Sequence, residues 1–134
     1  MSDAINHYMC GFEVLLEIHG KLDGFHLLED VFYLGSQGPD MFFYFNVLEK
    51  EENRINYGSL IHTQHINEFF TNSFDYLNNL ESSYERNVLY SYLCGFVTHH
   101  TLDVMTHPFI IYRTGKYRKS DPVSDKYKNL HKKY

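Results

Sequence analysis

Apolar side chains recur at helical spacing along residues 84–106, and this pattern predicts one long amphipathic helix. An α-helix repeats every 3.6 residues, so apolar residues three and four positions apart fall on the same side of it. The apolar positions of this stretch are Val88, Leu89, Tyr92, Leu93, Phe96 and Val97. Pro108 follows soon afterwards. Because proline cannot donate the backbone hydrogen bond of a helix interior, we expect the helix to end near it.

Similar spacing elsewhere predicts that helices make up most of the chain. One helix is expected over residues 5–18, a second over residues 23–34, and a third, continuous one over residues 58–80. Turn-forming residues fill positions 35–40, and the apolar run at 41–45 is too short to be assigned from its pattern. The sequence therefore predicts an all-α bundle. Its 134 residues suffice for one domain with a single hydrophobic core.

Charge is divided unevenly along the chain. The first 112 residues hold four Lys or Arg and fifteen Asp or Glu, whereas the rest hold eight basic and two acidic side chains. A solvated basic end is the simpler interpretation, and a patch that faces phosphate is the alternative. The net charge of −5 argues against a nucleic acid as the main partner.

The N-terminal residues do not resemble a secretory signal, because no basic segment precedes the apolar stretch and acidic residues interrupt it. No uninterrupted apolar run approaches the length of a membrane span. We therefore expect a cytoplasmic protein with at most peripheral membrane contact.

The strongest chemical signal is the sequence HHTLDVMTHP, in which His99, Asp103 and His107 are four residues apart. On a helix these three side chains project from one face. Imidazole and carboxylate groups stacked one turn apart can bind a divalent ion. A polar helix face with incidental histidines is the alternative. We favour metal binding, because the three residues recur at this spacing directly before a proline.

Other candidate residues carry weaker signals of their own. Asp40 follows Gly-Pro in a turn, where it could cap a helix or serve a functional role. His62 and His65 lie one turn apart near the start of a predicted helix, and either could be structural. His7 and His131 have the same two interpretations.

Three segments together resemble the zinc-dependent phospholipase C family. They are HYMCGFEVL at residues 7–15, LGSQGPDMFFY at residues 34–44 and CGFVTHHTLDVMTHPFI at residues 94–110. The resemblance covers nearly the whole chain in the expected order. It implies an all-α fold, shared with helical single-strand nucleases, that holds three zinc ions in a cleft.

The resemblance also implies which residues bind zinc. Carried over position by position, four of them would surround one ion: Asp40, His62, His99 and Asp103. His107 and His131 would bind a second ion, and His7 would join Asp103 at a third. Asp40 is also the residue that the resemblance implies for activating water.

The implied function is that of a metal-dependent phosphodiester hydrolase acting on phospholipid or another phosphodiester. A metal-binding helical domain without turnover is the alternative. Two departures favour the alternative. The chain has no Trp, which the family uses at its third site, and it stops at Tyr134, one residue before the expected Glu ligand. We therefore expect a domain shortened at its C-terminus that binds zinc but hydrolyses phosphodiesters poorly.

Overall fold

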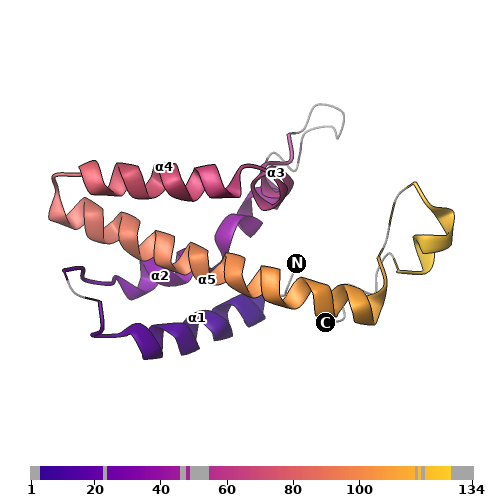
Figure 1. Ribbon diagram of the computed structural model, residues 1–134, viewed down its shortest axis with the longest axis horizontal. Helices are drawn as coiled ribbons and strands as arrows, with labels where there is room; N and C mark the ends of the chain where they lie inside the picture. Colours follow the sequence, from indigo (N-terminus) through magenta and orange to yellow (C-terminus); the bar gives the residue numbers. More distant parts are fainter. Residues whose placement is uncertain are drawn as a thin grey trace.

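The chain folds into an all-α bundle arranged around one long helix (Figure 1). The structure is a computed structural model that describes residues 4–22, 24–45, 48, 55–116, 118 and 120–127. These residues contain helices and turns but no strand, which confirms the predicted fold class. None of the helices among them is long and apolar enough to cross a membrane.

Five α-helices and two short 3-10 helices are described. In chain order they are α1 (Ala4–Ile18), α2 (Glu29–Ser36), η1 (Gly38–Tyr44), α3 (Tyr57–Thr63), α4 (Ile66–Asn79), α5 (Ser83–Thr114) and η3 (Pro122–Tyr127). Helix α5 runs through the middle of the molecule, with α1 and α4 on opposite sides of it and α2 packed along it (Figure 1). The core therefore forms around the first two-thirds of α5, and its last turns extend beyond the bundle.

Helices α2 and α5 cross with their backbones in contact, because each has a glycine at the crossing. A Cβ atom on Gly35 would overlap the carbonyl oxygen of Tyr92, and one on Gly95 would overlap that of Phe32. Any larger residue would push the helices apart. This close approach brings the end of α2 against the face of α5 that carries the candidate ligands.

Aromatic and aliphatic side chains fill the space between α5 and its neighbours. The fully buried apolar residues include Phe32 of α2, Leu77 of α4 and Leu93 of α5. Phe96 packs edge-on against Phe69 of α4, with ring centroids 5.1 Å apart. Burial of these side chains supplies the main driving force that holds α4 and α2 on α5.

Pro108 lies inside α5, so the prediction that the helix ends there was wrong. The helix is capped by Ser82, whose hydroxyl accepts a hydrogen bond from the Glu85 N–H, and it continues from Ser83 to Thr114. Proline leaves only the carbonyl four residues earlier without its helical donor. That residue, Val104, lies on the exposed side of the helix, where water can serve as the donor. The helix ends at Gly115, which adopts a positive φ of 76°.

The second predicted helix begins later than expected, at Glu29, because side chains of α5 form hydrogen bonds with the backbone that precedes it. The Leu28 N–H donates to the Ser91 hydroxyl at 2.9 Å, and the His26 N–H donates to the Asn87 side-chain oxygen at 3.1 Å. These bonds hold an extended backbone in which Leu28 has a φ of −93° and a ψ of 107°. The preceding residues that the structure describes, from position 24, are not helical.

The predicted continuous helix over residues 58–80 is broken into α3 and α4. Gln64 is extended, and His65 has a φ of 56°, the one positive value at a non-glycine residue in the described ranges. Asn56 caps α3 by accepting a hydrogen bond from the Ser59 N–H at 2.9 Å. The break turns α3 away from the axis of α4 and lets it pack on η1, the 3-10 helix formed by the run that we left unassigned.

We expect Gly95→Ala to lower the free energy of unfolding by about 1–3 kcal/mol, the usual cost of overpacking. Alanine favours a helix over glycine by about 1 kcal/mol, so any loss of stability in this variant must come from the crossing with α2. Urea unfolding followed by circular dichroism measures the effect. Thr101→Ala, on the exposed side of α5, is the control and should change little. An unchanged or more stable Gly95→Ala protein would contradict the proposed contact.

Candidate metal centre

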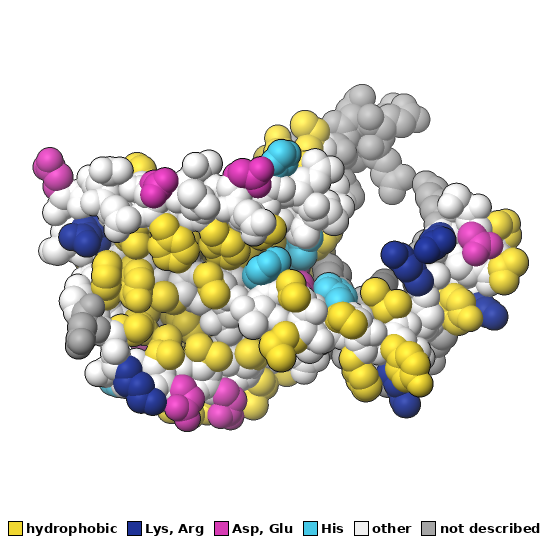
Figure 2. All heavy atoms as spheres, in the orientation of Figure 1, with side chains coloured by type: hydrophobic (Ala, Val, Ile, Leu, Met, Phe, Trp, Pro, Cys, Tyr) yellow, Lys and Arg dark blue, Asp and Glu magenta, His cyan; other side chains and the backbone are white. Residues whose placement is uncertain are grey.

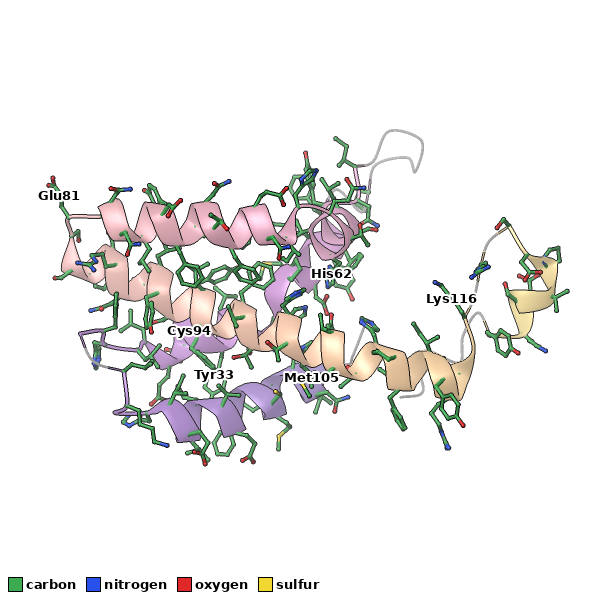
Figure 3. The ribbon with its side chains drawn as sticks, viewed as in Figure 1. Tyr33, His62, Glu81, Cys94, Met105 and Lys116 are labelled. Atoms are coloured by element: carbon green, nitrogen blue, oxygen red, sulfur yellow. The ribbon has the colours of Figure 1, made fainter. Side chains whose placement is uncertain are left out.

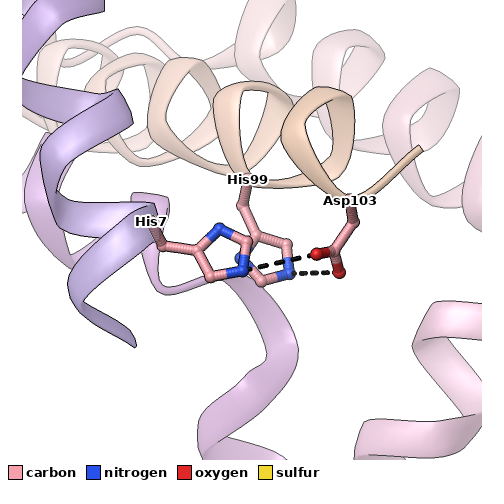
Figure 4. A group of neighbouring side chains, drawn as sticks. All are labelled: His7, His99 and Asp103. Atoms are coloured by element: carbon pink, nitrogen blue, oxygen red, sulfur yellow. Dashed lines mark ion pairs between the residues drawn. The ribbon is translucent and has the colours of Figure 1, made fainter. Parts of the chain in front are cut away.

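Five polar side chains from four elements converge beside the middle of α5. They are His7 of α1, Asp40 of η1, His62 of α3, and His99 and Asp103 of α5. Figure 4 shows His7, His99 and Asp103, whose side chains point toward one another. These three residues are buried, with 1%, 2% and 5% of their surface exposed, whereas Asp40 and His62 are half-buried. The cluster therefore has a closed inner part and a more open edge.

The donor atoms around His62 have separations close to those of ligands on one tetrahedral ion. The Nε2 atom of His62 lies 3.0 Å from Oδ1 of Asp40 and 3.4 Å from Nε2 of His99. Oδ2 of Asp103 lies 3.6 Å from His62 Nε2 and 3.4 Å from His99 Nε2. An ion with bonds of about 2.0–2.1 Å holds tetrahedral ligand atoms about 3.3–3.4 Å apart. Nε2 of His99 lies 3.9 Å from Oδ1 of Asp40, and donor atoms of Asp40, His62 and His99 all lie within 4.8 Å of one another. These three residues form one candidate ion site, and Asp103 borders it.

A second group of donors shares His99 with the first and includes Asp103. Nε2 of His7 lies 3.4 Å from Oδ1 of Asp103, and the His7 and His99 rings stack with centroids 3.9 Å apart. Donor atoms of His7, His99 and Asp103 all lie within 4.8 Å of one another. Asp103 therefore presents one carboxylate oxygen to each group.

Backbone carbonyls orient two of the histidines. Nδ1 of His99 lies 3.2 Å from the Ser36 carbonyl oxygen, and Nδ1 of His62 lies 2.7 Å from that of Gly58. A carbonyl oxygen only accepts, so we assign the hydrogen of each neutral ring to Nδ1. The Nε2 lone pairs then face the cluster, as they do in metal-binding histidines held by a carbonyl.

Glycine is required next to the His99 ring. Gly38 has a φ of 57°, and a Cβ atom at this position would overlap the imidazole of His99. The turn between α2 and η1 can therefore cross directly over the ring only with glycine here. This turn leads the chain into η1, which carries Asp40 two residues later.

Several buried polar atoms at the cluster have no hydrogen-bond partner within the described part of the chain. They include both ring nitrogens of His7, Oδ1 of Asp40 and both carboxylate oxygens of Asp103. In addition, the Nε2 lone pairs of His62 and His99 face each other at 3.4 Å. Burying unpaired acceptors opposite one another is costly. A divalent cation would satisfy the carboxylate oxygens and the imidazole lone pairs, so the residues present fit a metal.

The cluster also shifts the pKa values of its members. Burial alone would raise the pKa of Asp103, but the imidazoles of His7 and His99, each 3.4 Å from one of its oxygens, hold it far below the usual range. Burial lowers the pKa of His62, but the Asp40 carboxylate and the Gly58 carbonyl outweigh this effect and raise it. Asp103 therefore stays ionised, whereas a proton competes for His62 at a higher pH than for an ordinary histidine.

His107 and His131, the predicted ligands of another ion, are not part of these two groups. A step of four residues advances 40° beyond a full helical turn, so His107 is rotated about 80° from His99 around α5. It is half-buried, and burial is the main cause that lowers its pKa. His131 lies outside the described residues. The assignment of both to a metal stays a prediction.

Sequence reasoning missed the residues that orient the ligands. Ser36 and Gly58 act through backbone carbonyls, which any residue type carries, so a motif could not reveal them. Gly38 lies within the recognised GPD segment, and only the folded chain shows that its missing side chain makes room for His99.

In the metal-free chain we expect Asp103 to stabilise the fold at neutral pH and to lose this contribution in acid. Its folded pKa lies below the usual 3.8, so the contribution is complete above about that pH and declines below it. The free energy of unfolding of the parent chain should therefore fall between about pH 6 and about pH 2. In Asp103→Asn the fall should be smaller by about 2 kcal/mol.

Urea unfolding in the presence of chelator measures this difference. Asp75→Asn, at an exposed position on α4, is the matched control and should follow the parent chain. Equal acid sensitivity of Asp103→Asn and the parent chain would show that Asp103 does not interact with its histidines as described.

Comparison with known proteins gives one match. Searches of curated proteins and of solved structures returned no match. The family model described as "Zinc dependent phospholipase C" matches residues 7–134, a range that includes all five residues of the cluster. The chain belongs to the zinc-dependent phospholipase C family.

Proposed function

We propose that the cluster binds zinc and that Asp40, His62, His99 and Asp103 hold one ion. The observation that carries the proposal is the set of separations between donor atoms of these residues, 3.0–3.9 Å, which lies close to the spacing of ligands around a tetrahedral ion. Membership in a zinc-dependent family supports the choice of metal.

We propose that a second ion binds beside the first, with His7 and the other Asp103 oxygen among its ligands. A carboxylate that faces two donor groups can bridge two cations, and both Asp103 oxygens are buried without hydrogen bonds. His107 and His131 are proposed for a further ion on the strength of the family resemblance. Up to three ions would then bind.

The activity that these residues support is hydrolysis of a phosphodiester, with phospholipid as the substrate that the family suggests. Bound zinc supplies Lewis acidity toward phosphate and lowers the pKa of water to about 7. Asp40 is positioned to accept a proton at the open edge, because its side chain is 21% exposed against 6% for Asp103. Its Oδ1 atom lies 3.0 Å from Nε2 of His62, so the carboxylate stands beside the proposed ion.

A metal-binding domain without turnover is the second candidate. The observation that favours it is the nearly complete burial of His7, His99 and Asp103. Closed ligand shells are typical of structural metal sites, whereas catalytic sites keep a position open to substrate. The two candidates therefore differ in whether the Asp40 edge admits a phosphate group.

We expect His99→Gln to weaken zinc binding by at least about 100-fold, because this ring belongs to both donor groups. Calorimetric titration of zinc into the chelator-treated chain measures the affinity. His65→Gln removes an exposed imidazole that pairs with Glu68 and should bind zinc like the parent chain. If the parent chain binds no zinc, both candidates fail.

We expect Asp40→Asn to reduce turnover of a water-soluble chromogenic phosphodiester by about 100- to 10,000-fold, the usual contribution of a general base. Asparagine keeps an oxygen ligand but cannot take up the proton, so kcat should fall more than zinc affinity does. Asp75→Asn serves again as the control. Zinc binding by the parent chain without chelator-sensitive turnover would favour the non-catalytic domain.

A further inference from the structure

The last turns of α5 and the following 3-10 helix project from the bundle (Figure 1). We call the described residues from Val104 to Tyr127 the arm. Met105 lies near its start, and Lys116 lies just beyond the end of α5 (Figure 3). No other described helix runs beside its outer half, so its surface is accessible.

The arm carries a row of large apolar side chains in solvent. Met105, Phe109 and Tyr112 are 73%, 60% and 85% exposed. Their spacing of four and three residues places them on one face of α5, opposite the buried residue Ile110. Val123 of η3 is also exposed. An apolar row that faces water in this way indicates an interaction surface.

Basic side chains accompany this apolar row. Lys116, Arg118 and Lys126 are exposed, and Figure 2 shows basic and hydrophobic side chains next to one another on the arm. The chain holds eight basic and two acidic residues from position 113 onward, against four basic and fifteen acidic residues before it. Within the arm itself, the described residues include four basic and two acidic side chains, so the arm is positive while the bundle is strongly negative.

We propose that the arm docks the protein on a membrane surface rich in anionic lipid. Phe and Tyr rings can enter the boundary between head groups and acyl chains, with the basic side chains in contact with lipid phosphates. The positive charge of the arm favours an anionic membrane as its partner. The same membrane would repel the acidic bundle, so the arm would be the part of the protein that docks. None of these side chains is among the proposed metal ligands.

The proposal rests on the proposed function only in that a phospholipid substrate would lie in the same membrane. Docking itself requires no turnover, so it is measured separately.

The outer face of α1 provides an internal comparison. Ile5, Met9, Phe12 and Leu16 are exposed there in a row of similar size, but Glu13 and Glu17 flank it. A surface with this charge should avoid anionic lipid.

Co-sedimentation of the zinc-loaded chain with vesicles tests the proposal. Each basic residue near an anionic surface strengthens binding by roughly fivefold. Vesicles of phosphatidylcholine with about one-quarter phosphatidylserine should therefore bind the chain at least about tenfold more tightly than phosphatidylcholine alone, and added salt should weaken binding. Equal binding to both vesicles would overturn the proposal.

Two double variants locate the surface. Phe109→Ser with Tyr112→Ser, and Lys116→Glu with Arg118→Glu, should each reduce binding to the anionic vesicles by about tenfold or more. Ile5→Ser with Leu16→Ser on α1 is the matched control and should bind like the parent chain. Circular dichroism confirms that each variant folds. Arm variants that bind vesicles normally would overturn the proposal.

Two more measurements distinguish membrane docking from damage to the metal centre and from self-association. Turnover of the water-soluble phosphodiester should be the same in the arm variants and the parent chain, so loss of docking is distinguishable from failure of the metal centre. Analytical ultracentrifugation detects self-association. One combined result would refute membrane docking: the parent chain does not bind anionic vesicles but forms a dimer, and Phe109→Ser with Tyr112→Ser makes it monomeric. The arm would then be the contact surface for a second copy of the chain.

Discussion

The backbone contact between α2 and α5 is the constraint on which the candidate metal centre depends. Because Gly35 and Gly95 have no side chains, the two helices approach closely enough for the Ser36 carbonyl to contact Nδ1 of His99. Ser36 is itself fully buried under Gly11 of α1. This one crossing therefore sets the ring orientation of His99, the position at which α1 packs, and the path of the chain toward Asp40.

The same crossing explains why the cluster can be both buried and unpaired. Helices α1, α2 and α5 enclose His7, His99 and Asp103, and their burial excludes the water that would otherwise solvate these groups. For Asp103, the attraction of its histidines outweighs the cost of burying the charge, but the facing Nε2 lone pairs of His62 and His99 gain nothing from it. A bound cation would offset this remaining cost, which couples the stability of the fold to metal binding.

Several features were predictable because they depend on residue type and spacing. Helical periodicity indicated the all-α fold, and the resemblance of three segments to a known family indicated the family and the group of Asp40, His62, His99 and Asp103 as neighbours. The breaks were not predictable. Leu28 stays extended because side chains of α5, distant in sequence, bind the backbone before it. Pro108 stays helical because the carbonyl it leaves unpaired lies on the solvent side of α5.

The sequence by itself determined the chemical nature of the centre, since only imidazole and carboxylate side chains at these positions can offer such ligand atoms. Its geometry was decided by the tertiary structure. His7 and Asp103 are 96 positions apart and meet only because α1 packs on α5, and His62 reaches His99 only because the chain breaks before His65. Spacing along one helix constrains residues within about two turns, whereas contacts between helices depend on packing that no local pattern records.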